Sequence, residues 1–323
     1  MAAVVDAASA ESDFTLYPLV VIAGPTASGK TALALHLAER FNGEIVSCDA
    51  VAVYRGLDVG SAKPTAQERA RVPHHAIDIL DPDQPSTAGD YARVTRAALS
   101  DIKQRGRLPI VTGGTGLYLR ALLEGLAPAP PRDDALRDRL RERAARRGSA
   151  YLHRMLERVD RRAAESIHPN DVPKMIRSLE VTLGARRPQS EQWRAGREPL
   201  QGFRVLQMGL DPPRTALYAR INERAARMFD EGLIEETAAV RARFGEQCRA
   251  LGSLGYAQAA ALLLGESTRA GAIAGAQQGH RNYAKRQMTW FRRDKSIEWL
   301  AGFGDDADVQ AQADERVKRH LEE

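Results

Sequence analysis

A glycine-rich turn near the start of the chain carries the clearest chemical signal in the sequence. Residues 19–23 are apolar and predict a short buried strand, and an amphipathic helical pattern begins at Lys30. The turn between them reads Gly24-Pro25-Thr26-Ala27-Ser28-Gly29-Lys30-Thr31. Glycines let backbone N–H groups point at anionic oxygens, and a helix N-terminus and a lysine add positive charge. The pattern therefore predicts a phosphate or diphosphate site in which Thr31 holds Mg²⁺.

A carboxylate is predicted to stand beside this turn. Residues 43–49 have the pattern of a second strand, which ends in Asp49. Ligands of an open parallel sheet bind at the carboxyl ends of its strands, so Asp49 is expected next to the phosphate loop. A third predicted strand, residues 108–112, leads into a second glycine turn, Gly113-Gly-Thr-Gly, where anions are also expected. This strand lacks the acidic residue that ATPases place there for Mg²⁺, which argues against a motor or switch but not against a small-molecule kinase.

The elements that would position these residues predict an α/β fold with a parallel sheet and a helical insertion. A Pro/Ala-rich linker at residues 126–131 marks the start of the insertion, and a polar loop at 186–202 returns the chain to the core. The predicted parts are a loose tail at 1–17, a core formed by 18–125 and 203–323, and an insertion at 126–202. Within the core we expect a strand at 203–210, one long helical pattern over 214–243 and a basic helix over 280–293. Residues beyond Gly302 are polar, and we expect them to be peripheral.

Composition describes an ordinary globular protein with a modest positive charge. The chain has 323 residues, a formal net charge of +5 and only two cysteines, Cys48 and Cys248. Two cysteines supply neither a disulfide framework nor a metal-ligand spacing, and residues 1–13 lack the basic start and apolar core of a signal peptide. No apolar run approaches the roughly 18 residues that span a bilayer. We expect a cytoplasmic protein without a membrane partner, and nothing in the sequence asks for more than a monomer.

Positive charge is concentrated in the predicted insertion. Eleven arginines and six acidic residues lie between Pro131 and Ala164, a surplus equal to that of the whole chain. Two interpretations remain open: a solvated helix with local Arg–Asp and Arg–Glu pairs, or a surface that follows a nucleic-acid backbone. The basic helix at 280–293, with Tyr283, Trp290 and Phe291 interleaved, is likewise either a core element or an RNA contact.

Several motifs follow one another along the chain from about residue 18 to about residue 300. They are the phosphate loop 24–31, Asp49 with Val53-Tyr-Arg-Gly-Leu-Asp-Val-Gly-Ser-Ala-Lys-Pro64, Gly-Gly-Thr-Gly-Leu-Tyr at 113–118, Gly255-Tyr256, and Ala-Lys-Arg-Gln-Met-Thr-Trp at 284–290. In this order, the motifs resemble the tRNA dimethylallyltransferase (tRNA isopentenyltransferase) family of bacteria. The resemblance implies a P-loop NTPase-like core with an insertion that grips the tRNA anticodon stem-loop. It also implies transfer of a dimethylallyl group from dimethylallyl diphosphate to N6 of adenosine 37.

The resemblance assigns roles residue by residue. The loop 24–31 would hold diphosphate and Mg²⁺, Asp49 matches the general base on N6, Thr115 matches a threonine at the reaction channel, and Arg220 matches a diphosphate-binding arginine. The tRNA-contacting positions that it implies are Asp49, Ala50, Val51, Ala52, Thr115, Arg137, Lys174, Arg177, Gly255, Tyr256, Arg281, Lys285 and Arg286.

Three departures from the family pattern fall near the RNA-recognition positions. Ala50-Val51-Ala52 replaces Ser-Met-Gln, Ala257 replaces an arginine, and His280 replaces a threonine. We therefore hypothesise that prenyl transfer is kept with altered base recognition. The alternatives are a P-loop kinase of a small molecule or nucleotide, which would share only the loop 24–31 and its ATP-binding motif, and an RNA-binding protein that has lost catalysis.

Overall fold

A parallel sheet forms the centre of the computed structural model, which describes residues 16–192 and 197–323. Apolar side chains fill its inner strands because both faces are covered by helices. The strand order is β3-β2-β4-β1-β5-β6, and all pairings are parallel. The strands are β1 (Tyr17–Ala23), β2 (Gly43–Cys48), β3 (His74–His75), β4 (Leu108–Gly113), β5 (Phe203–Leu210) and β6 (Glu298–Leu300). The predicted fold class is confirmed, and the ends of β1, β2 and β4 lie on adjacent strands.

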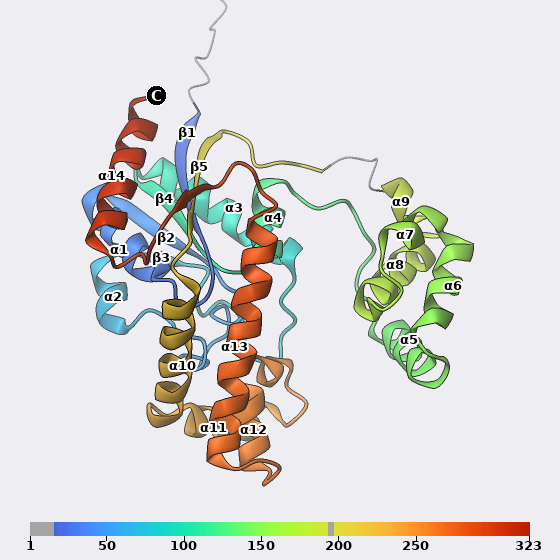
Figure 1. The fold of residues 1–323 in the computed structure, drawn as a ribbon. Helices are drawn as coiled ribbons and strands as arrows, with labels where there is room; N and C mark the ends of the chain where they lie inside the picture. The colour runs from blue at the N-terminus through green and yellow to red at the C-terminus, as the bar shows by residue number, and fades with distance from the viewer. Residues whose placement is uncertain (1–15, 193–196) are drawn as a thin grey trace, which may run out of the picture. The chain divides into compact units, whose positions relative to one another are not determined.

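Helices cover the two faces of the sheet and extend beyond its carboxyl edge. Helices α1 and α14 lie together on one face, α3 lies against β2 and β4, and α10 packs along α13 (Figure 1). The helices of this unit are α1 (Lys30–Arg40), α2 (Ala66–Arg71), α3 (Ala88–Gln104), α4 (Gly116–Leu123), α10 (Arg214–Asp230), α11 (Leu233–Phe244), the 3-10 helix η2 (Arg249–Gly252), α12 (Tyr256–Leu263), α13 (Arg269–Phe291) and α14 (Ala307–Glu322).

The chain divides into two compact units. One unit contains the sheet and comprises the stretches to Leu122 and from Leu200, and the other runs from Leu123 to Pro199. The second unit is helical and has its own apolar core, which includes Leu140, Leu152 and Leu179. Its helices are α5 (Asp134–Arg147), α6 (Ser149–Val159), α7 (Arg161–Ser166), α8 (Val172–Ala185) and α9 (Gln189–Gln192).

Two sequence expectations about the fold were wrong. The pattern over 214–243 is not one helix, because Gly232 takes a positive φ of 107° and separates α10 from α11. The residues beyond Gly302 are not peripheral. Helix α14 buries Val309, Ala313 and Val317 in the core cluster of the sheet, because these apolar residues recur at helical spacing on one face.

Candidate active site at the carboxyl edge of the sheet

The phosphate loop connects β1 to α1 at the middle of the sheet. Ala27 and Gly29 have φ angles of 64° and 84°, so the backbone makes the sharp left-handed turns that the glycine-rich sequence predicts. Nζ of Lys30 donates to the carbonyl of Pro25 at 2.6 Å and closes the loop. The Ser28 hydroxyl is fully buried and has no hydrogen-bond partner among the described residues. An unpaired polar atom of this kind is costly, so the loop favours a ligand that can supply a partner.

Two cations without acidic partners lie in the cleft around this loop. The cleft has a volume of about 580 Å³ and is lined by Lys30 and by Arg224 of α10. Burial, with Arg224 nearby, lowers the pKa of Lys30 to about 7 against the opposing effect of Asp49. Burial also lowers the pKa of Arg224 to about 10. The Arg224 guanidinium donates to the Thr26 hydroxyl, and neither cation has an ion pair within the described part of the chain. Both head groups open onto the cleft, where an anion would relieve their repulsion.

Asp49 lines the same cleft, directly after β2, as the parallel topology predicts. Its Oδ1 accepts the N–H groups of Val51 at 2.7 Å and Ala52 at 3.1 Å. The Thr115 hydroxyl oxygen accepts the N–H of Ala50 at 3.2 Å, so this threonine fixes the backbone that carries the carboxylate. Because backbone donors hold one oxygen, the Asp49 carboxylate has a defined orientation in the cleft.

A tyrosine of α13 completes the wall beside the carboxylate. Burial, and next the charge of Asp49, raise the pKa of Tyr283 to about 12. Burial raises the pKa of the Cys48 thiol to about 12 as well, so both groups are neutral at physiological pH. Asp49 is therefore the carboxylate that the predicted strand end contributes to the cleft, beside neutral groups such as Tyr283 and the cations Lys30 and Arg224.

Gln287 joins two loops of the site, and the sequence analysis did not single it out. Its Oε1 accepts the N–H of Thr26 at 2.8 Å, and its Nε2 donates to the carbonyl of Gly114 at 2.9 Å. The side chain thus ties the phosphate loop to the glycine turn after β4. The buried residues of α13 include His280, Ala284, Gln287 and Phe291, spaced by four, three and four. This helical period was the signal that could have found the glutamine inside the motif at 284–290.

Arg220 lies at the edge of the cleft and is paired. Its Nη1 donates to Oδ1 of Asp305 at 2.7 Å, and its guanidinium carbon lies 3.7 Å from the centre of the Phe303 ring. That hydrogen bond raises the pKa of Arg220 and lowers the pKa of Asp305. The sequence predicted an arginine here but did not anticipate its acidic partner.

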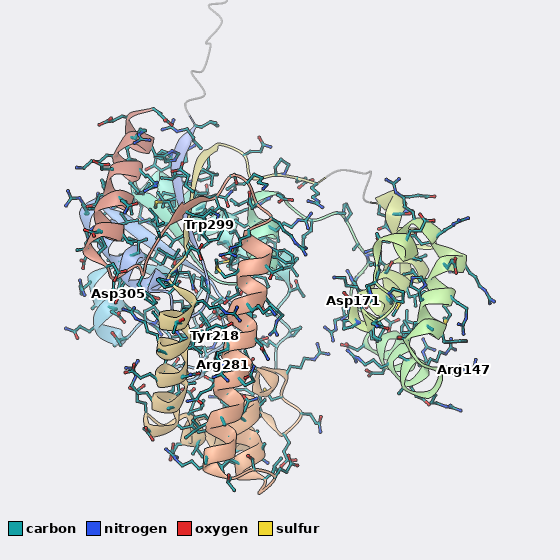
Figure 2. The ribbon with its side chains drawn as sticks, viewed as in Figure 1. Arg147, Asp171, Tyr218, Arg281, Trp299 and Asp305 are labelled. Atoms are coloured by element: carbon teal, nitrogen blue, oxygen red, sulfur yellow. The ribbon has the colours of Figure 1, made fainter. Side chains whose placement is uncertain are left out.

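The predicted tRNA-contacting residues of the sheet unit fall into two groups. Lys285 and Arg286 are exposed on the outer face of α13 beside Trp290. Arg281 is half-buried and bonds Gln278 at 2.6 Å (Figure 2). Gly255 and Tyr256 are both buried, and the Tyr256 hydroxyl donates to Glu236 at 2.5 Å. Tyr256 is a core residue of this structure, and its predicted role in tRNA binding stays a prediction.

The three residues after Asp49 also differ in how far they are exposed. Ala50 and Val51 are half-buried, whereas Ala52 is 4 % exposed and lines the cleft. A methyl group therefore stands where the resemblance implies a hydrogen-bonding amide.

In the insertion, two of the predicted tRNA-contacting arginines form ion pairs with the same acidic residue. The carboxylate of Glu180 is buried and accepts hydrogen bonds from Arg137 at 2.7 Å and from Arg177 at 2.5 Å. Burial raises the pKa of Glu180, but the hydrogen bonds of both arginines outweigh this and lower it. Only 16 % of the Arg137 side chain is exposed, so its main contact in this structure is internal, and its contact with tRNA stays a prediction. Lys174 is exposed and pairs with Asp171 at 2.7 Å.

Residues 16–192 and 197–323 contain neither a cluster of metal-ligating side chains nor a membrane-spanning helix. No group of three or more His, Cys, Asp and Glu side chains could hold a metal ion there. No helix in those residues is long and apolar enough to cross a membrane.

The parallel sheet, the phosphate loop and the strand-end carboxylate define an α/β protein of the P-loop class. A family model described as IPP transferase matches residues 52–294, and one described as isopentenyl transferase matches residues 17–74. The chain belongs to the IPP transferase family. It is therefore an enzyme of the prenyltransferase class, which favours that interpretation over the kinase.

Individual relatives agree with this assignment. A protein of Koribacter versatilis named tRNA dimethylallyltransferase is 60 % identical over 300 residues, covering 93 % of this chain and 98 % of the relative. A solved tRNA isopentenylpyrophosphate transferase from Bacillus halodurans is 36 % identical, with a TM-score of 0.70 over 94 % of this chain and 97 % of that one. A eukaryotic dimethylallyltransferase, at 24 % identity and a TM-score of 0.77 over 94 % and 80 % of the two chains, shares the fold.

Proposed function

We propose that this enzyme transfers a dimethylallyl group from dimethylallyl diphosphate to N6 of adenosine 37 in tRNA, releasing diphosphate. The names of its relatives support the reaction. The observation that carries the proposal is one cleft that holds both a carboxylate, Asp49, and two cations without acidic partners, Lys30 and Arg224. An allylic transfer needs both features, because negative charge grows on the leaving diphosphate while the amine loses a proton.

The phosphate loop and its two cations stabilise the leaving diphosphate. As the C–O bond breaks, Lys30, Arg224 and the loop N–H groups bind the charge that develops on diphosphate. Gln287 holds Thr26 and Gly114 in fixed relation, so the loop is organised before the substrate arrives. Diphosphate would also give the buried Ser28 hydroxyl the partner that it lacks among the described residues.

Magnesium is proposed to bind in this cleft together with the substrate. Thr31 is exposed at the start of α1 and lines the cleft. Its hydroxyl would hold Mg²⁺ together with phosphate oxygens and water, the ligands that this ion prefers. Bound in this way, the ion supplies further positive charge to the leaving diphosphate.

Asp49 acts as the general base on adenosine. The N6 lone pair is delocalised into the purine ring, so attack on the allyl carbon requires removal of a proton from nitrogen. Backbone N–H groups hold the Asp49 oxygen Oδ1 and so orient the carboxylate for this task. The buried methyl group of Ala52 offers no hydrogen bond to the base, and recognition of adenine would rest on shape and on other groups.

For the RNA, the proposed surfaces are the outer face of α13 and the arginines of the insertion. Lys285, Arg286 and Trp290 combine charge with an exposed aromatic ring, which suits an unstacked loop. We place the enzyme in the cytoplasm as a monomer, in line with its two free cysteines and its RNA substrate.

A reconstituted reaction tests the proposal. Protein, Mg²⁺, dimethylallyl diphosphate and unmodified tRNA with adenosines at positions 36 and 37 are incubated, and the nucleosides are analysed by mass spectrometry. We expect N6-dimethylallyladenosine at position 37. Absence of product with tRNA still bound would identify an RNA-binding protein that has lost catalysis. If no product forms and ATP stabilises the protein against heat as much as dimethylallyl diphosphate does, the result would favour the kinase interpretation.

A further inference from the structure

The segment between β6 and α14 forms one wall of the phosphate loop. The N–H of Gly304 donates to the carbonyl of Ser28 at 2.9 Å. Oδ2 of Asp306 accepts the N–H of Phe303 at 2.7 Å, and Gly302, Phe303 and Gly304 are all buried. Helix α14 anchors this segment through its apolar face in the core. The segment is therefore a fixed part of the site.

Asp305 extends from this fixed segment and lines the cleft around the phosphate loop. A Cβ atom built on Gly29 would lie 2.7 Å from Asp305 Oδ1 and 2.7 Å from the Gly304 nitrogen. The carboxylate consequently stands against the loop backbone, in the cleft that also contains Lys30. An aspartate in this position is a negative charge at a site whose other features favour an anion.

Arg220 is the partner that can move. It projects from α10 on a long side chain and is 41 % exposed, with the Asp305 side chain at 45 %. The Nη1–Oδ1 distance of 2.7 Å and the stacking on Phe303 hold its guanidinium toward Asp305. Exposed pairs of this kind contribute little to stability, so they exchange partners at small cost.

We infer that Asp305 is a positioning residue that competes with diphosphate for Arg220. The inference rests on the proposed function, since it concerns diphosphate in the phosphate loop. Without ligand, Arg220 is paired with Asp305. When diphosphate binds, the guanidinium turns to the phosphate oxygens, and the Asp305 carboxylate is left unpaired beside them. Its repulsion weakens the binding of the diphosphate product and speeds its release.

Calorimetric titration with inorganic pyrophosphate and Mg²⁺ tests this competition. Asp305→Asn keeps the shape of the side chain but removes its charge, and we expect about fivefold tighter binding, near the upper limit for an exposed ion pair. Asp308→Asn is the matched control, because it removes one negative charge three residues away at an exposed position with no hydrogen bond among the described residues. It should bind like the unchanged protein. Asp305→Ser is a second variant in case the amide forms new contacts.

Kinetics separate competition from a structural role. Asp305→Asn should lower the inhibition constant of pyrophosphate and slow its dissociation, while a fold defect would lower the melting temperature and weaken binding. Unchanged or weaker pyrophosphate binding in a folded Asp305→Asn protein overturns the inference. Weaker binding confined to Mg²⁺-containing buffer also overturns it, because Asp305 would then assist the metal. If the unchanged protein does not bind pyrophosphate at all, the proposed function itself fails.

Discussion

The cations of the core cleft and those of the helical insertion are arranged in opposite ways. In the cleft, Lys30 and Arg224 stand without an acidic partner in the described structure, and burial lowers the pKa of each. In the insertion, arginines of α5 such as Arg141 and Arg146 are exposed and pair with acids three or four residues away. A buried cation without an acidic partner indicates a binding site for an anionic ligand, whereas a solvent-exposed ion pair contributes little to stability and changes only the charge of the surface.

Removal of the cleft carboxylate should have the largest effect on activity. We expect Asp49→Asn to lower turnover by about 10²- to 10⁴-fold, the range of general-base contributions, with tRNA binding nearly unchanged. Single-turnover rates and filter binding measure the two quantities. Asp83→Asn makes the same chemical change at an exposed position and should be fully active. Full activity of Asp49→Asn would remove this residue from the mechanism.

Loss of an internal ion pair should destabilise the insertion. Arg137→Leu leaves the buried Glu180 with Arg177 as its remaining ion-pair partner in the described structure, and we expect a loss of about 1.5–3 kcal/mol, the range for hydrogen bonds to a charged group. Hydrogen exchange of the α5 and α8 amides measures this local free energy. Arg141→Leu removes an exposed arginine from the same helix and should cost less than about 1 kcal/mol. Equal losses in the two variants would erase the distinction between internal and surface arginines.

Replacing Lys30 by a neutral residue should weaken pyrophosphate binding but stabilise the unliganded protein. Lys30→Met is expected to weaken pyrophosphate binding about 10- to 100-fold, because a charged hydrogen-bond donor is lost. The same change should raise the melting temperature of the unliganded protein, since a desolvated charge is removed. Scanning calorimetry with and without pyrophosphate reports both effects. Lys295→Met, at an exposed position, should change neither, and a lower melting temperature for Lys30→Met alone would contradict the model.

Diphosphate binding should take up a proton at Lys30. The pKa of this lysine is about 7 in the unliganded protein, so at pH 8 most of it is neutral. A bound anion raises that pKa, and the complex then binds about one more proton; affinity consequently falls as pH rises above 7. Calorimetry at pH 8 in buffers of different ionisation enthalpy measures the uptake. Lys30→Arg cannot lose its charge and should show no uptake from this position, and equal uptake by both proteins would contradict the assignment.

Surface arginines of the insertion should have the smallest and most salt-dependent effect. Arg139 and Arg143 are exposed and make no ion pair within the described part of the chain. Reversing both to Glu should weaken tRNA binding, and each lost phosphate contact should reduce the slope of log K against log salt by about one. Filter binding across a salt series measures the slope. An unchanged slope would mean that the insertion is a solvated helical unit without a role in RNA binding.

Local features of the site were predictable from the sequence. Strand, turn and helix around residues 24–31 follow from contiguous residues, and the place of Asp49 follows from the general geometry of parallel sheets. Gln287 could have been found from the helical period of α13. Arg224 and Asp305, by contrast, come from α10 and the segment before α14. Only the packing of distant elements brings these two residues to the loop, and no motif spacing indicates that packing.

One error concerns a signal that was present in the sequence. The apolar residues at 309, 313 and 317 share one helical face, yet the many charged neighbours suggested a peripheral tail. The burial of Tyr256 is not visible in its motif. Its hydroxyl donates to Glu236 of α11, and the same carboxylate accepts the N–H groups of residues 58–60, so distant segments enclose the side chain.

Helix α13 has a consequence for how this enzyme can diversify. Its inner face, with Ala284, Gln287 and Phe291, is bound to the catalytic loops and the core, so substitutions there alter the chemistry. Its outer face, with Lys285 and Arg286, is in solvent. Because a helix separates the two sets by rotation alone, selection can change one face while leaving the other intact. A new RNA preference can therefore evolve on the very element that holds the phosphate loop, with no rebuilding of the reaction centre.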